Sequence, residues 1–142
     1  MIRSIFCSIL HTLVFFGIVV FCLSGSRTSA QNQDAQVIEV TAKKYDYSPE
    51  PVHIKRGMKV QLKITATYHD HGFKIATFPD GAGQSGTPGL VFAAAQDCWQ
   101  LKKGETTTIE FLAQTAGTYT FRCCHTCGVG HRGMKGELVV EQ

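Results

Sequence analysis

Four residues near the C-terminus carry side chains that bind soft metal ions. They are spaced four, four and three positions apart, and they are Cys123, Cys127, His131 and Met134. Two thiols, an imidazole and a thioether form a ligand set that suits copper and suits magnesium or calcium poorly. Neither a helical nor a strand period brings all four side chains to one face. The spacing therefore predicts a loop wrapped around a metal.

The residues around the first thiol support this prediction. Strand alternation places Cys123 on the same face as Tyr119 and Phe121, so its thiol lies where an apolar strand runs into the loop. A buried thiolate without a partner is costly, and bound copper would supply the compensating charge. Glycines, which allow the backbone to turn tightly, recur in the loop at Gly128, Gly130 and Gly133.

The pattern C-x3-C-x3-H-x2-M resembles the ligand loop of the binuclear copper A (CuA) domain, which occurs in cytochrome c oxidase subunit II and in nitrous oxide reductase. The resemblance implies that Cys123 and Cys127 bridge two copper ions. It implies that His131 caps one copper and that Met134 is a weak ligand. The residue midway between the cysteines, His125, is then expected to offer its backbone carbonyl.

The same resemblance requires a second histidine from an upstream strand, followed by a small residue and an aromatic. His71 meets this requirement, because Gly72 and Phe73 follow it. His69 competes with it, since two residues that are two apart share a face in an extended strand. The Gly-Phe sequence favours His71 as the ligand and leaves His69 as a solvated side chain.

Other metal or thiol chemistry fits the loop less well. Cys124 and Cys127 have the C-x-x-C spacing of a thiol redox pair or of half a zinc site. A thioredoxin-type pair would need a βαβ context, and a zinc site would need a second cysteine pair and would leave Met134 unused. A c-type haem would need histidine directly after the second cysteine, where Gly128 stands. Copper is therefore the expected metal.

Two cysteines of the expected domain fall outside the copper motif. Cys98 and Cys124 would be free to form a disulfide in an oxidising compartment, which would pin the preceding segment to the metal loop. Spacing does not fix connectivity, so this pairing is a hypothesis.

Alternating apolar and polar residues predict about seven short strands and no long amphipathic helix. Strands with one apolar and one polar face suit two packed sheets. The expected fold is therefore all-β, and the CuA resemblance implies a cupredoxin-like Greek-key β-sandwich over residues 36–142. The segments are 38–42, 52–54, 60–66, 73–75, 109–113, 119–123 and 138–140.

The segment 77–97 interrupts the strand period and is rich in glycine, with two prolines. It is interpreted as an insertion after the His71 strand. Two alternatives stay open: the insertion shapes the mouth of the copper site, or it is a tolerated surface loop.

The N-terminus has the features of an export signal. Residues 5–23 are mainly apolar, and Thr28-Ser29-Ala30 resembles a cleavage site, so residues 1–30 are expected to be a signal peptide and 31–35 a short polar leader. The alternative is an uncleaved membrane anchor at residues 5–23. Either way the domain is expected to be periplasmic or extracellular, with membrane contact only if the segment is retained.

The net charge limits the classes of binding partner that are expected. The net charge of +3 falls to +1 without residues 1–30, because that segment holds Arg3 and Arg27 and no acidic residue. A nearly neutral domain offers no broad basic surface, so no nucleic acid partner is expected.

The sequence thus predicts an exported copper-binding protein that transfers single electrons through a CuA-like centre of two copper ions. The redox partner expected is a cytochrome c or an oxidase. The resemblance also suggests an oxidase subunit II-like component, which is not an enzyme on its own. Two alternatives stay open: a periplasmic copper carrier or chaperone, and a mononuclear cupredoxin with a single copper ion.

Overall fold

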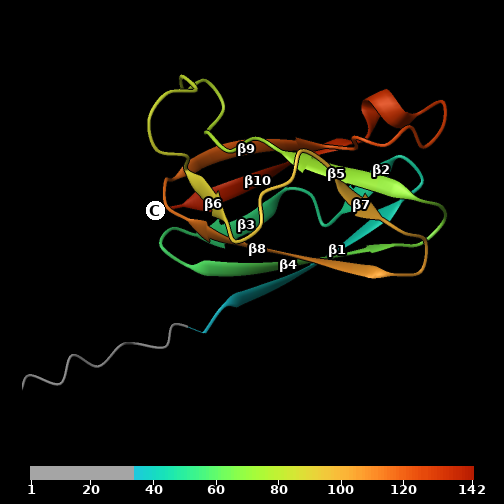
Figure 1. Cartoon of the computed structure of the whole chain (residues 1–142), viewed down its shortest axis with the longest axis horizontal. Coiled ribbons are helices and arrows are strands. Elements are labelled where there is room, and N and C mark those ends of the chain that lie inside the picture. The colour runs from blue at the N-terminus through green and yellow to red at the C-terminus, as the bar shows by residue number, and fades with distance from the viewer. Residues whose placement is uncertain (1–33) are drawn as a thin grey trace, which may run out of the picture. The chain divides into compact units, whose positions relative to one another are not determined.

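The computed structural model describes residues 34–142, which form a β-sandwich (Figure 1). Its elements, in chain order, are β1 (Gln36–Lys43), β2 (Asp46–Ser48), β3 (Val52–Lys55), β4 (Lys59–Ala66), β5 (His71–Ile75), β6 (Leu90–Phe92), β7 (Trp99–Leu101), β8 (Thr106–Ala113), β9 (Gly117–Arg122), the short 3-10 helix η1 (His131–Gly133) and β10 (Lys135–Glu141). The predictions for residues 1–30 and for positions 31–33 of the leader lie outside the described residues.

The strands form two sheets of five. One sheet has the order β2-β1-β4-β8-β6, and the other has the order β3-β10-β9-β5-β7. Strand β1 pairs in parallel with β4, and β3 pairs in parallel with β10. The chain changes sheet at every connection from β2 to β9. The expected all-β, cupredoxin-like sandwich is confirmed. In the described part of the chain, no helix is both long and apolar enough to cross a bilayer.

Each long strand buries one face against the opposite sheet. In β4, the residues Val60, Leu62, Ile64 and Ala66 are buried and alternate with polar residues that face outward. Burying each aliphatic side chain of this size stabilises the fold by roughly 1.5–3 kcal/mol. The alternation of apolar and polar residues that predicted this strand therefore matches the alternation of buried and outward-facing side chains.

Three strands were not predicted: β2, β6 and β7. Each has only three residues, too few to display a period, and they are held by pairing with β1, β8 and β5 respectively. Strand β6 lies inside the segment 77–97 that was expected to be irregular. Its residues Leu90 and Phe92 pack on the core. The sequence did not predict this strand, because the segment around it is rich in glycine.

Residues 77–89 of the insertion lie far from the candidate metal loop, so the alternative that they shape the mouth of its site is wrong. The loop before β6 lies at the end of the sandwich opposite the loop that joins β9 to β10 (Figure 1). Asp80 donates its backbone N–H to the Thr118 carbonyl at 2.8 Å, and Pro79 lies against Gly117. These contacts are at the start of β9, whereas Cys123 follows its end. Strand β5 runs from His71, beside the metal loop, toward the opposite end of the sandwich. The segment that follows β5 therefore starts at that opposite end.

Tyr47 links the two sheets. It lies on β2 of the first sheet, and its hydroxyl donates a 2.6 Å hydrogen bond to the Gly72 carbonyl on β5 of the second. Its ring meets Phe73 and Phe121 edge-on, at centroid distances of 5.9 and 5.3 Å. The side chain is 1% exposed, so this hydroxyl satisfies a carbonyl that water does not reach.

Removing that hydroxyl is expected to destabilise the protein. Tyr47→Phe keeps the ring packing but leaves the Gly72 carbonyl without its partner, which should lower the free energy of unfolding by about 1–3 kcal/mol. Denaturant unfolding followed by circular dichroism measures the change. Tyr68→Phe is the matched control, because Tyr68 is 65% exposed and its hydroxyl faces water. Equal stability of both variants would contradict the role assigned to Tyr47.

Candidate metal centre

The candidate metal loop, residues 123–134, joins two paired strands. Arg122 at the end of β9 lies opposite Lys135 at the start of β10. Cys123 then donates its backbone N–H to the Met134 carbonyl at 2.9 Å, which closes the base of the loop. The loop projects from one end of the sandwich, where Figure 1 shows it in orange-red with the short helix η1. The first and last ligands of the motif are thus fixed by the sheet itself.

The two thiols of the motif lie side by side. The sulfur atoms of Cys123 and Cys127 are 3.7 Å apart. The backbone carbonyl oxygen of His125 lies 3.1 Å from the Cys123 sulfur, while the His125 side chain is exposed. The loop therefore presents the two thiols and the intervening carbonyl to one point, and it turns the His125 imidazole away to solvent.

The remaining loop residues approach the second thiol. Nδ1 of His131 lies 3.8 Å from the Cys127 sulfur, and the Met134 sulfur lies 3.9 Å from it. Met134 is 1% exposed, and His131 and Cys127 are half-buried. The thioether therefore comes from the core side and the imidazole from the solvent side.

His71, the first residue of β5, completes the cluster from another strand. Its ring, with the thiols of Cys123 and Cys127, forms a group whose ligand atoms all lie within 4.8 Å of one another. The residue is 0% exposed, and neither ring nitrogen has a hydrogen-bond partner. A fully buried imidazole with both nitrogens unpartnered is costly unless something binds it. This arrangement fits a metal ion next to the thiols.

The protonation of these groups agrees with metal binding. Burial lowers the pKa of His71, and the neighbouring His69 lowers it further, so the ring is neutral and has a lone pair to donate. Burial, together with the adjacent Cys123 thiol, raises the pKa of Cys127 to about 11. A soft cation would displace the proton from that thiol. The thiolate binds such a cation strongly, whereas a free thiolate in a buried site is costly.

His69 lies beside the cluster. Its ring packs against His71 at a tilt of 45° with centroids 4.4 Å apart, and its Nδ1 is buried without a partner. The expectation that His69 is a solvated side chain is therefore wrong. Among residues 34–142, the compact group of ligand atoms includes His71 and excludes His69. The strand places the two rings in contact, but only His71 reaches the thiols.

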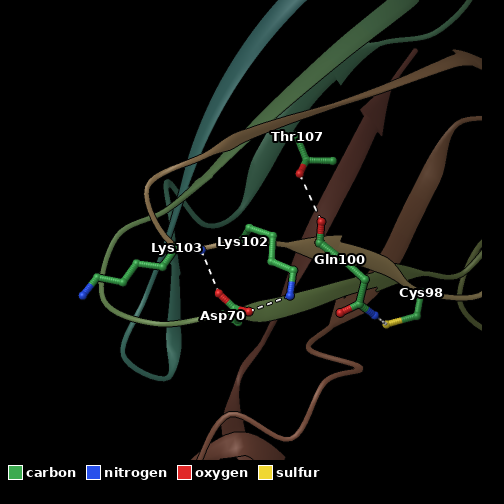
Figure 2. A network of polar contacts seen from close by, with 6 residues as sticks. All are labelled: Asp70, Cys98, Gln100, Lys102, Lys103 and Thr107. Atoms are coloured by element: carbon green, nitrogen blue, oxygen red, sulfur yellow. Dashed lines mark hydrogen bonds and ion pairs between the residues drawn. The ribbon is translucent and has the colours of Figure 1, made fainter.

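Asp70 fixes the start of β5 and was not identified from the sequence. It accepts hydrogen bonds from the Lys102 side chain at 2.8 Å and from the Lys103 backbone N–H at 2.9 Å, as Figure 2 shows. The hydrogen bond from Lys102 is the main reason why the pKa of Asp70 lies below its ordinary value. These contacts anchor the residue directly before His71 to the end of β7.

A disulfide joins Cys98 to Cys124, with their Cα atoms 5.9 Å apart. Cys98 directly precedes β7, and in Figure 2 the side-chain amide of Gln100 is directed at its sulfur. The disulfide lies against Gly72: a Cβ on that glycine would be 2.7 Å from the Cys124 sulfur and 3.0 Å from the Cys98 sulfur. Glycine is required there because of this close approach.

Tyr45 supports the metal loop and was also missed. A Cβ on Gly128 or on Gly130 would collide with its ring. Gly128 also has a left-handed φ of 125°, so its turn needs glycine, as predicted. Gly130 has ordinary backbone angles and is glycine because of the ring, whereas a Cβ on Gly133 would meet open space. Nothing in the spacing of Tyr45, which precedes both glycines by more than eighty residues, indicated this contact.

Comparisons with known proteins agree with this geometry. A family model described as multicopper oxidase matches residues 23–142. Cytochrome c oxidase subunit 2 of Thermus thermophilus is 28% identical over 105 residues, which cover 74% of this chain and 65% of that protein. A second subunit 2 sequence from this species is equally identical and is covered over 52% of its length.

Solved structures show the same fold. The periplasmic domain of cytochrome oxidase subunit II from Bradyrhizobium japonicum superimposes with a TM-score of 0.57 at 14% identity, covering 75% of this chain and 84% of that one. Reduced auracyanin from Roseiflexus castenholzii gives a TM-score of 0.55 at 22% identity, covering 76% and 98%.

The chain belongs to the multicopper oxidase family, since the family model covers most of its length. It is a copper-binding, cupredoxin-like domain of the CuA type, related to subunit II of cytochrome c oxidase. It spans less than two thirds of the length of the subunits that it matches.

The packing of Tyr45 leads to a prediction about two glycines of one loop. Gly130→Ala should force the Tyr45 ring away and lower the free energy of unfolding by about 1–3 kcal/mol, the usual effect of overpacking. Gly133→Ala adds the same methyl group in open space and should change it by less than about 0.5 kcal/mol. Thermal unfolding and copper retention in a chelator both measure the difference. Similar behaviour of the two variants would contradict the contact.

Proposed function

We propose that this protein carries a binuclear copper centre and transfers single electrons through it. The ligands are the thiolates of Cys123 and Cys127, with His71, His131, Met134 and the carbonyl of His125. The observation that carries this proposal is the approach of the two sulfurs to 3.7 Å, with His71 close to both. His131 and Met134 lie beside Cys127, and the His125 carbonyl lies beside Cys123. Two sulfurs held this close can bridge two ions.

The residues around the centre favour electron transfer over substrate chemistry. Copper supplies one-electron exchange when it is bound. Cys123, His71 and Met134 are buried, so they exclude water from the site and hold their positions when the charge changes. Two thiolates cancel much of the positive charge of two copper ions, which lets the site stay in a dry environment.

The partner is proposed to be a redox protein such as a cytochrome c or an oxidase, in an assembly like that of the related subunit II. The metal loop and its base offer a contact surface: Val129 in the loop is fully exposed, and Arg132 in the loop and Lys135 at its base are exposed and basic. The domain is proposed to act as an electron carrier for such a complex and to have no oxidase activity alone.

Export to the periplasm or cell exterior is proposed on two observations. The segment 5–23 has the length and apolarity of a signal, followed by a small-residue cleavage site. The disulfide between Cys98 and Cys124 also suits an oxidising compartment.

Copper delivery is the second candidate. It is favoured by the half-exposure of Cys127 and His131, through which copper could be exchanged with another protein. The burial of the other three ligands favours a centre that keeps its copper.

The test is to load the full chain with copper, count the metal and record its electron spin resonance. The expected result is about two copper ions per chain and a mixed-valence signal in which one unpaired electron is shared by two copper nuclei. A single copper with splitting from one nucleus would instead identify a mononuclear site. Rapid loss of copper to a modest chelator would favour delivery.

Substitution of the bridging thiols is expected to abolish the shared-electron signal. Cys123→Ser or Cys127→Ser replaces a soft thiolate with a hydroxyl that binds copper poorly, so at most one ion should be retained. Cys124→Ser makes the same change outside the ligand set and should leave the copper content and signal intact. Copper analysis and electron spin resonance of the three variants decide the point. A shared-electron signal in Cys127→Ser would show that the ligand assignment is wrong.

A further inference from the structure

The metal loop contains a third cysteine beside the two proposed ligands. Cys124 directly follows Cys123 and precedes Cys127 with C-x-x-C spacing. That spacing is used by thiol pairs that oxidise readily to a disulfide. A loop with three thiols therefore has more than one way to pair them, and only one leaves both copper ligands free.

Cys98 removes the third thiol from this competition. It reaches Cys124 from the start of β7 and binds it in a disulfide. In the described residues, Cys123 and Cys127 are the only free thiols. The cysteine that could form a disulfide with a ligand is thus already bonded to a partner outside the loop.

The backbone of β5 separates the disulfide from the free thiols. Gly72 donates its N–H to the Cys123 sulfur at 3.4 Å, while both disulfide sulfurs occupy the space where its side chain would be. Successive residues of an extended chain point to opposite faces, so Cys123 and Cys124 diverge around this glycine. Cys98 therefore holds Cys124 on the face of β5 that is turned away from the proposed copper ligands.

We propose that Cys98 is a specificity-determining residue: it decides which two of the three loop thiols bind copper. This inference rests on the proposed copper centre. With Cys98 present, Cys124 is held in the disulfide, and Cys123 and Cys127 stay reduced as the pair that accepts the metal.

Without Cys98, a competing reaction opens. The thiols of Cys124 and Cys127 would lose their two protons and pass two electrons to two copper(II) ions. One sulfur–sulfur bond forms, two sulfur–hydrogen bonds break, and two copper(I) ions result. Cys127 is then lost as a ligand.

The test breaks the same disulfide from either end. Full-length Cys98→Ser and Cys124→Ser are incubated with copper(II), then analysed for copper per chain, electron spin resonance and disulfide mapping by mass spectrometry. We expect Cys98→Ser to lose most of its copper and to contain Cys124 bonded to Cys127 or Cys123. We expect Cys124→Ser to match the wild type, because its leftover thiol is outside the loop.

The double variant Cys98→Ser, Cys124→Ser separates thiol competition from a simple cross-link. It should regain the copper content of the wild type, since no third thiol is left. Equal loss of copper in both single variants, or no recovery in the double variant, would show that the disulfide acts only as a cross-link and would overturn the inference. Absence of copper in the wild type would instead overturn the proposed function.

Discussion

The close approach of β5 to the metal loop at Gly72 is the contact on which the centre depends. The Gly72 carbonyl accepts a hydrogen bond from Tyr47, its N–H is directed at the Cys123 sulfur, and its missing side chain leaves room for the disulfide. Because His71 directly precedes Gly72, any displacement of the Gly72 backbone would move the imidazole away from the thiols. The contacts of Gly72 thus fix the position of β5 relative to the other sheet and to the metal loop.

The centre combines a rigid inner side with an accessible outer side. His71, Cys123 and Met134 are anchored by strand pairing and buried in the core between the sheets. Cys127 and His131 lie in a segment whose shape depends on glycines and on the Tyr45 ring. Ligands fixed by strands need little rearrangement when charge changes, while ligands near the surface lie within reach of a partner. This division suits a protein that exchanges electrons at its surface and keeps its metal inside.

The relationship to subunit II of cytochrome c oxidase concerns this domain and its loop. The fold is shared with auracyanin as well, so the sandwich alone does not specify the function that it carries. Cys98 and Cys124 add a feature that depends on tertiary contacts: a disulfide laid across a ligand strand, next to two thiols that must stay reduced.

Local spacing was enough to predict that the side chains of Cys123, Cys127, His131 and Met134 lie together, because they belong to one short segment whose ends are tied by adjacent strands. The strand period likewise predicted the long strands and the all-β class, since alternation and burial have the same cause. The short strands β2, β6 and β7 escaped, because three residues show no period and their pairing comes from distant neighbours. The contact of His71 with the thiols and the position of the 77–89 loop arise only when β5 is inserted between β9 and β7. The support from Tyr45 arises only when the turn between β1 and β2 packs against the metal loop. Strand order and register are long-range properties, and no spacing along the chain encodes which backbone will pass beneath a given side chain.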